Sequence, residues 1–145
     1  MQRVYLASDH AALEMKALLI EHLKTLDCDP VDLGPNDDSS VDYPDYAAKL
    51  AQALGADKDA KGVLMCGTGI GISIAANRHK HIRAALCHDV TGAKFTRQHN
   101  DANVVVIGAR TSGPETAKDI VSAFFKTNFE GGRHQRRIDK LADLG

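Results

Sequence analysis

Short apolar runs separated by helical segments restrict the fold of this chain more than any other feature. The runs lie at Val4–Ala7, Val31–Leu33, Gly62–Cys66, Ile82–Cys87 and Asn103–Ile107. Continuous apolar runs of this length are typical of strands that are covered on both faces of a parallel sheet. We therefore expect an α/β fold of the three-layer, doubly wound, Rossmann-like kind, with a five-stranded parallel sheet between helices.

Helical periodicity fills the intervals between these runs. One helix carries Met15, Leu19, Leu23 and Leu26 on one face, and further helices are expected at Tyr46–Leu54, Ile72–Arg78, Val90–Gln98, from Pro114 onward, and from Arg133 to Leu144. The last of these is a C-terminal helix with many charges and few apolar residues, so a partner subunit is a natural neighbour for it.

Size and charge narrow the class of protein. The 145 residues correspond to one domain spanning 1–145. With 18 basic and 19 acidic residues, the formal charge of −1 argues against a generally basic nucleic-acid or membrane-surface binder. The sequence has no apolar run of about twenty residues and no signal-peptide pattern at its start. Three cysteines without metal-type spacing indicate free thiols, a cytoplasmic location and no metal site.

A glycine-rich turn is the strongest local signal. Cys66-Gly67-Thr68-Gly69-Ile70-Gly71 joins an expected strand to an expected helix. Glycines at this spacing let several backbone N–H groups turn inward and bind an anion, although tight packing of the turn alone would also explain them. The spacing matches neither the dinucleotide-binding fingerprint G-x-G-x-x-G nor the phosphate loop G-x-x-x-x-G-K-[ST].

Cys66 is the candidate base or nucleophile. A thiolate is favoured beside a helix N-terminus, whereas the alternative is a buried, inert cysteine. Cys28 and Cys87 have no such loop, and we expect them to be inert. A cysteine phosphatase would place an arginine six residues after the nucleophile, and Ile72 occupies that position.

Other polar residues flank the expected strands. Asp9 and His10 follow the first strand, where Asp9 is as suited to capping a helix as to chemistry. His99-Asn100-Asp101 precedes the valine-rich strand and could simply form a turn. Arg133 and Arg137 share one helix face, which suits either a phosphate clamp or ordinary ion pairs.

These residues belong to a recognisable set of motifs. They are Asp9-His10, Asp42-Tyr43-Pro44-Asp45-Tyr46-Ala47, the segment from Cys66 to Asn77, Arg97-Gln-His-Asn-Asp101, and Glu130-Gly-Gly-Arg-His-Gln-Arg137. In this order they closely resemble the B-type ribose-5-phosphate isomerases, a family that also includes the galactose-6-phosphate isomerase subunits. Ala12 is a small departure, because a glycine is expected soon after the Asp-His pair.

The resemblance implies interconversion of ribose 5-phosphate and ribulose 5-phosphate without metal or organic cofactor. It also implies a homodimer with active sites at the subunit interface, and pairing of dimers into tetramers stays open. Part of the family uses a glutamate near the start of the glycine-loop helix as the base. No glutamate lies between Glu21 and Glu115 here, so the resemblance selects Cys66.

The roles of His99 and Cys66 come from the resemblance, and the chemistry of this reaction suggests roles for the other candidates. His99 opens the sugar ring, Cys66 removes the carbon-bound proton, Thr68 orients the thiol or donates a hydrogen bond, and Asp9 handles hydroxyl protons. The backbone N–H groups of Gly67, Gly69, Ile70 and Gly71, with the Asn100 amide, hold the enediolate. The phosphate is held by His10, Arg110, Arg133 and Arg137, with His134 a weaker candidate, while Tyr43 borders the sugar.

Two alternatives to this substrate and activity stay open. One keeps the chemistry but takes a six-carbon sugar phosphate such as allose or galactose 6-phosphate. The other is a phosphosugar-binding module that has lost turnover, against which the retention of Cys66, Thr68 and His99 argues.

Overall fold

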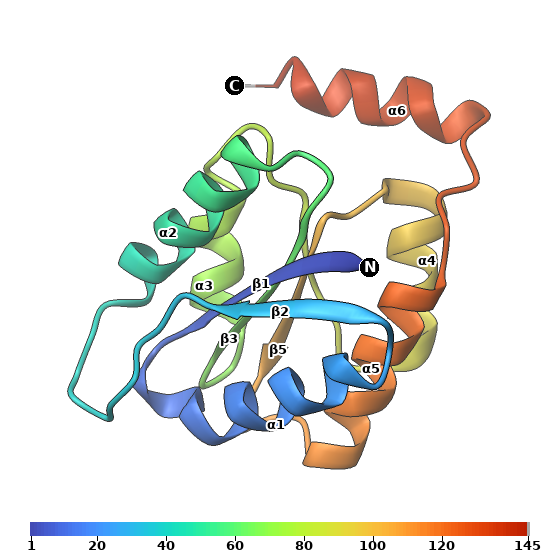
Figure 1. Cartoon of the computed structure of the whole chain (residues 1–145). Coiled ribbons are helices and arrows are strands. Elements are labelled where there is room, and N and C mark those ends of the chain that lie inside the picture. Colours follow the sequence, from blue (N-terminus) through green and yellow to red (C-terminus); the bar gives the residue numbers. More distant parts are fainter. Residues whose placement is uncertain (145) are drawn as a thin grey trace.

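A five-stranded parallel sheet in the order β2-β1-β3-β5-β4 forms the centre of the chain in the computed structural model, which describes residues 1–144 (Figure 1). This confirms the predicted doubly wound α/β fold. The elements are β1 (Gln2–Ser8), a 3-10 turn η1 (His10–Ala12), α1 (Leu13–Lys24), β2 (Cys28–Asp32), α2 (Tyr43–Ala56), β3 (Lys61–Cys66), α3 (Ile70–Ala76), β4 (Ala84–Leu86), α4 (Val90–Asn100), β5 (Val104–Gly108), α5 (Pro114–Lys126) and α6 (Arg133–Ala142).

Apolar side chains on both faces of the sheet explain its continuous apolar strands. Along β3, Val63 and Met65 pack with α1, α4 and α5, whereas Leu64 and Cys66 pack with α2 and α3. Because successive side chains of a strand point to opposite faces, each central strand supplies both cores. Helix α6 belongs to neither layer; it lies beyond one end of the sheet in Figure 1, and its first turn contacts α4.

The two edge strands differ from their predicted ranges. We predicted Val31–Leu33, but β2 spans Cys28–Asp32, since its pairing with β1 sets its length. Pro30 is tolerated there because β2 pairs on one side only. At the other edge, β4 is shorter than the predicted Ile82–Cys87. The Asn77 side chain bonds both backbone groups of Ala84, at 2.8 and 2.9 Å, and so occupies the free edge of this strand.

Helix ends shift by a few residues relative to the prediction. Helix α2 begins at Tyr43 rather than Tyr46, with Pro44 in its first turn. Helix α3 begins at Ile70, two residues early, and α6 ends at Ala142, two residues before Leu144. Among residues 1–144, no helix has the length and apolar character needed to cross a membrane.

The topology determines which loops share an edge of the sheet. Strands β1, β3 and β5 are neighbours, and Ser8, Cys66 and Gly108 lie at their carboxyl ends. Helix α4 runs from the carboxyl end of β4 back to the amino end of β5, a length of about 16 Å for its 11 residues. Residues that follow a central strand and residues that end α4 therefore lie at opposite edges.

Candidate active site

The glycine-rich turn holds the Cys66 thiol in a fixed position. Cys66 ends β3 and is only 4% exposed. Its Sγ accepts the Gly69 N–H at 3.2 Å, and Thr68 Oγ1 accepts the Ile70 N–H at 3.2 Å. The two contacts fix the position of the sulfur at the carboxyl end of β3.

Two of the predicted anion-binding N–H groups are therefore engaged within the turn. Gly69 serves the sulfur and Ile70 serves Thr68, which departs from our expectation that both face the substrate. The helical hydrogen bonds of α3 start with the Ser73 N–H, which donates to the Gly69 carbonyl. Gly71 lies in the first helical turn, whose N–H groups have no acceptor within the helix. Its N–H is thus suited to an enediolate oxygen.

Close packing makes glycine necessary at two points of this turn. Gly69 has φ +78°, and a Cβ there would lie 3.2 Å from the backbone of Ile107 and Gly108. A Cβ on Gly108 would lie 2.5 Å from the Thr68 carbonyl group. Backbone hydrogen bonds from Ala109 to Cys66 and from Arg110 to Gly67, at 2.9 and 2.8 Å, complete the junction between the β3 and β5 ends.

We expect Gly69→Ala to lower the free energy of unfolding by about 1–3 kcal/mol, because alanine at positive φ is strained and its Cβ meets backbone. Gly113→Ala is the matched control, since φ is −74° at Gly113 and no atom lies within 4 Å of its Cβ position. Gly113 is the N-cap of α5, where alanine is somewhat less favourable than glycine, so we expect that control to lower stability by less than about 1 kcal/mol. Urea denaturation of both variants measures the difference, and equal losses would contradict the packing described for this turn.

Asp9 and His10 lie beside Cys66. The Asp9 N–H donates to the Met65 carbonyl at 3.1 Å, which joins the end of β1 to the end of β3. One Asp9 oxygen accepts the Ala11 N–H at 2.9 Å, so the predicted capping role is confirmed. His10 Nδ1 accepts the Val41 N–H at 3.1 Å. That contact leaves the proton of a neutral His10 ring on Nε2, as a donor for a ligand.

Tyr43 and Arg110 border the same edge. The Tyr43 ring lies against Gly71, where a Cβ would approach Cζ to 2.6 Å, and Tyr43 is 40% exposed. Arg110 is exposed, and its guanidinium lies 3.6 Å from the Cβ position of Gly67. The carboxyl edge thus brings together seven of the residues predicted for the site, namely Asp9, His10, Tyr43, Cys66, Thr68, Gly71 and Arg110.

The remaining candidates form a second group, on α4 and α6. The His99 ring stacks between Phe95 and His134, with centroid distances of 5.0 and 4.4 Å. Arg133 and Arg137 are exposed on either side of His134 in sequence, one helical turn apart on α6. His134 itself is buried. Desolvation lowers its pKa, aided by the charges of His99 and Arg133, so a neutral ring is favoured.

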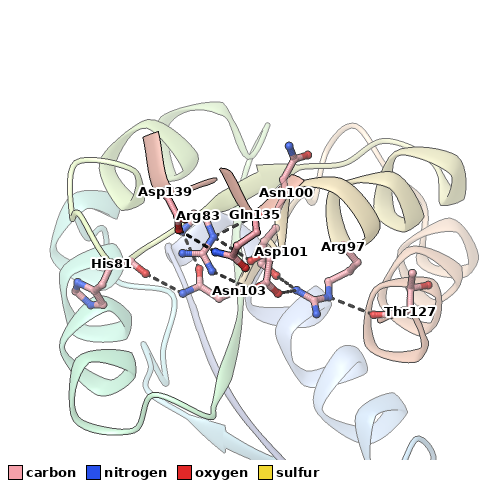
Figure 2. Close-up of polar contacts among 10 residues, drawn as sticks. His81, Arg83, Arg97, Asn100, Asp101, Asn103, Thr127, Gln135 and Asp139 are labelled. Atoms are coloured by element: carbon pink, nitrogen blue, oxygen red, sulfur yellow. Dashed lines mark hydrogen bonds and ion pairs between the residues drawn. The ribbon is translucent and has the colours of Figure 1, made fainter. Parts of the chain in front are cut away.

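Hydrogen bonds place the end of α4, with Asn100 and Asp101, at the amino edge of the sheet (Figure 2). Arg83, just before β4, donates to the carbonyls of Asn100 and Asp101 at 3.2 and 3.0 Å. The buried Arg97 binds Asp101 Oδ1 at 2.8 Å and the Thr127 carbonyl at 3.3 Å. His99 and Asn100, at the end of α4, therefore lie at the opposite edge of the sheet from Cys66 of the same chain.

Comparison with known proteins agrees with the motifs. The sequence profile described as Ribose/Galactose Isomerase matches residues 4–141. The chain belongs to this family. It is 47% identical over 139 residues to a probable ribose-5-phosphate isomerase B of Mycoplasma pneumoniae, covering 95% of this chain and 91% of the relative. It is 40% identical over 144 residues to ribose-5-phosphate isomerase B of Escherichia coli, covering 99% and 97%.

Solved structures of the ribose/galactose isomerase family share the fold over the full length. The ribose 5-phosphate isomerase of Thermotoga maritima has a TM-score of 0.95 at 45% identity and covers 99% of both chains. The type B enzyme of Trypanosoma brucei has the same TM-score at 39% identity, covering 99% of this chain and 98% of that chain.

The other two cysteines of this family member are buried in the core. Burial raises the pKa of Cys87 to about 11, with a smaller contribution from Asp89, and burial also raises the pKa of Cys28. Both are thus thiols at neutral pH, as the prediction of inert cysteines requires. Cys28 is the first residue of β2.

Three residues near the site carried no role in the sequence analysis. Lys16 is buried and binds Asp32 Oδ1 at 2.7 Å and the Pro35 carbonyl at 2.6 Å, which anchors the loop leading to Tyr43. Phe95 and Glu130 each lie four residues before a histidine of the stack. Phe95 and His99 lie in the same helix, so their i, i+4 spacing could have predicted their contact from the sequence. Glu130 lies before the start of α6, so helical spacing does not predict its contact with His134.

Proposed function

We propose that this chain interconverts ribose 5-phosphate and ribulose 5-phosphate through an enediolate, with Cys66 as the base. The chain is an aldose–ketose isomerase by its family, and the relatives described above are named for ribose 5-phosphate. The observation that carries the mechanism is the Gly69 N–H donating to Cys66 Sγ at 3.2 Å, in a turn that also contains Gly71 and lies beside Asp9 at the end of β1. This is the one thiol in the described chain that combines a donor with a position at the carboxyl edge.

We further propose that each active site combines the carboxyl edge of one subunit with the α4–α6 group of a second copy. His99 and Cys66 of one chain are too far apart for one five-carbon sugar, yet the mechanism needs both. In a homodimer related by a two-fold axis, the same contact occurs twice and completes two sites.

Exposed apolar side chains support a subunit interface near the glycine turn. Ile70 and Ile74 are 53% and 54% exposed on one face of α3, beside the candidate site. Phe95, in the His99 stack, is 50% exposed. Contact between two copies of the chain would bury these exposed apolar side chains, which lie near both halves of the site.

The first step opens the cyclic sugar. A proton leaves the anomeric hydroxyl and another reaches the ring oxygen, which breaks the bond between that oxygen and carbon 1. His99 is 39% exposed and so is available to a partner's substrate, and imidazole exchanges protons near neutral pH. Phe95 and His134 hold its ring between them.

The second step moves a proton from carbon 2 to carbon 1. The Cys66 thiolate takes the carbon 2 proton, negative charge passes to the oxygen on carbon 1, and the Gly71 N–H stabilises that oxygen. The Cys66 thiol then returns the proton to carbon 1, while the hydroxyl proton on oxygen 2 moves to oxygen 1. The backbone N–H of Asp9 donates to the carbonyl of Met65, the residue before Cys66. The Asp9 carboxylate would therefore carry the proton from oxygen 2 to oxygen 1.

The substrate phosphate would meet donors from both subunits. Arg110 and the Nε2–H of His10 come from the edge that holds Cys66, and Arg133 and Arg137 come from the second copy. Asn100 lies beside His99 and would donate to a sugar oxygen. His134, whose lowered pKa favours the neutral ring, is the weaker phosphate ligand and serves to support His99.

A panel of aldose phosphates tests this function. EDTA-treated protein is mixed with ribose, allose and galactose phosphates, and ketose formation is followed. We expect ribose 5-phosphate to be converted fastest. Preference for a six-carbon substrate would overturn the pentose assignment, and binding of all three without conversion would overturn the activity.

The arginines of α6 should act on the phosphate specifically. Each charge-assisted contact contributes about 1.5–3 kcal/mol, so Arg137→Ala should weaken binding of ribose 5-phosphate by roughly tenfold to a hundredfold. Arg137→Lys should recover only part of this, since an ammonium lacks the planar two-pronged contact. Affinities for ribose 5-phosphate and for unphosphorylated ribose are measured by calorimetry.

Arg136→Ala is the matched control, because Arg136 is an exposed neighbour on the same helix. It should change neither affinity appreciably. Equal losses for the ester and the free sugar in Arg137→Ala would contradict the phosphate clamp.

A further inference from the structure

Three metal-binding side chains converge where α4 meets the start of α6. Glu130 Oε1 lies 3.7 Å from His134 Nε2 and 3.9 Å from His99 Nε2. Ligand atoms of all three residues lie within 4.8 Å of one another. A backbone hydrogen bond from the Glu130 N–H to the Gln98 carbonyl, at 3.1 Å, ties the segment before α6 to α4 and keeps the three together.

We propose that His99, Glu130 and His134 form a binding site for one divalent transition-metal ion of the Zn²⁺ class, and that the bound ion inhibits the isomerase. The reaction itself uses no metal in this proposal. The ion competes for the nitrogen lone pair with which His99 moves protons.

The distances suit a zinc-sized ion. Bonds of about 2.0–2.1 Å in tetrahedral geometry place neighbouring ligand atoms about 3.3 Å apart. The two observed separations exceed this by roughly half an ångström, which small side-chain movements can remove. The His99 and His134 rings are nearly parallel, at 14°, so each must also turn for its lone pair to face the ion. The χ2 torsion of histidine is soft enough to allow this.

The ligand types select the class of metal. Two imidazoles and one carboxylate suit Zn²⁺, Co²⁺, Ni²⁺ and Cu²⁺, whereas Mg²⁺ and Ca²⁺ prefer oxygen ligands. Each imidazole offers one ring nitrogen as a ligand, and the carboxylate offers an oxygen. Arg133 and Arg137 oppose a cation, and Glu130 offsets part of that repulsion. Three protein ligands leave a fourth position for water or a sugar hydroxyl.

Cobalt titration of the EDTA-treated full-length protein tests the site directly. Tetrahedral Co²⁺ absorbs strongly in the visible range, and competition against Zn²⁺ then gives the zinc affinity. We expect one ion per chain. His134→Asn should weaken Zn²⁺ binding by at least about a hundredfold, and Glu130→Gln by about tenfold. His88→Asn, which removes an exposed histidine elsewhere, should bind as wild type does. Equal affinity in His134→Asn and His88→Asn, or binding that does not saturate at one ion per chain, would overturn the site.

Inhibition is a separate readout and rests on the proposed function. Zn²⁺ should slow conversion of ribose 5-phosphate by wild type and by His88→Asn over the range in which it binds, and EDTA should restore the rate. Saturating ribose 5-phosphate should weaken Zn²⁺ binding. If Zn²⁺ binds the three residues without slowing turnover, the inhibitory part of the proposal is wrong and the ring-opening role of His99 is contradicted, while the metal site stands.

Discussion

Cys66→Ala is expected to abolish turnover while ribose 5-phosphate still binds almost as tightly as to wild type. The thiolate acts on the proton of carbon 2 and contributes little to holding the bound sugar, so its loss raises the barrier more than it weakens binding. Cys66→Ser should be nearly as inactive, because a hydroxyl is a far weaker base near neutral pH. Exchange of the carbon 2 hydrogen with deuterated solvent, measured by NMR, reports the proton-abstraction step itself.

Cys87→Ala is the matched control for this experiment. Cys87 is as buried as Cys66, but its raised pKa keeps it a thiol, and no glycine turn surrounds it. It should exchange the substrate proton as wild type does. Alkylation should inactivate wild type with one reagent bound per chain, and substrate should protect it. Wild-type exchange rates in Cys66→Ala would eliminate Cys66 as the base.

His99→Asn is expected to slow conversion of ribose 5-phosphate by about 10²–10⁴-fold, the usual contribution of a general acid–base group. The loss should be much smaller with ribulose 5-phosphate, whose phosphorylated oxygen cannot close a five-membered ring. The open-chain ketose needs no ring opening before proton transfer. Initial rates in the two directions are compared before product accumulates, since the equilibrium constant is unchanged.

His88→Asn controls for the loss of an imidazole, and its two initial rates should match wild type. Equal losses in both directions for His99→Asn would contradict the ring-opening role. They would instead point to a function in binding or in subunit contact.

The sheet and the glycine turn were predictable because local patterns determine them. The apolar runs around Val63 and Val105 need cover on both faces, and the glycines from 67 to 71 mark a strand–helix turn. The range of β2 was not predictable, since it depends on pairing between Gln2–Leu6 and Cys28–Asp32. The use of the Gly69 and Ile70 N–H groups depends on side-chain positions that spacing does not reveal.

The separation of the two halves of the site was in part readable from the sequence. Cys66 ends an apolar strand, whereas His99 precedes one, and in a parallel sheet these positions fall at opposite edges. The stack of Phe95, His99 and His134 was not readable, because α6 is brought to α4 by a loop whose course the sequence pattern does not specify.

Mixing two inactive variants tests the shared active site most directly. Cys66→Ala and His99→Asn are unfolded together, refolded as a mixture and assayed with ribose 5-phosphate. In a mixed dimer, one site carries both substitutions and the other carries neither. Random pairing should therefore restore about a quarter of the wild-type activity, although each variant alone is nearly inactive. If the mixture stays as inactive as its components while size-exclusion chromatography shows mixed dimers, Cys66 and His99 do not act in one site across the interface.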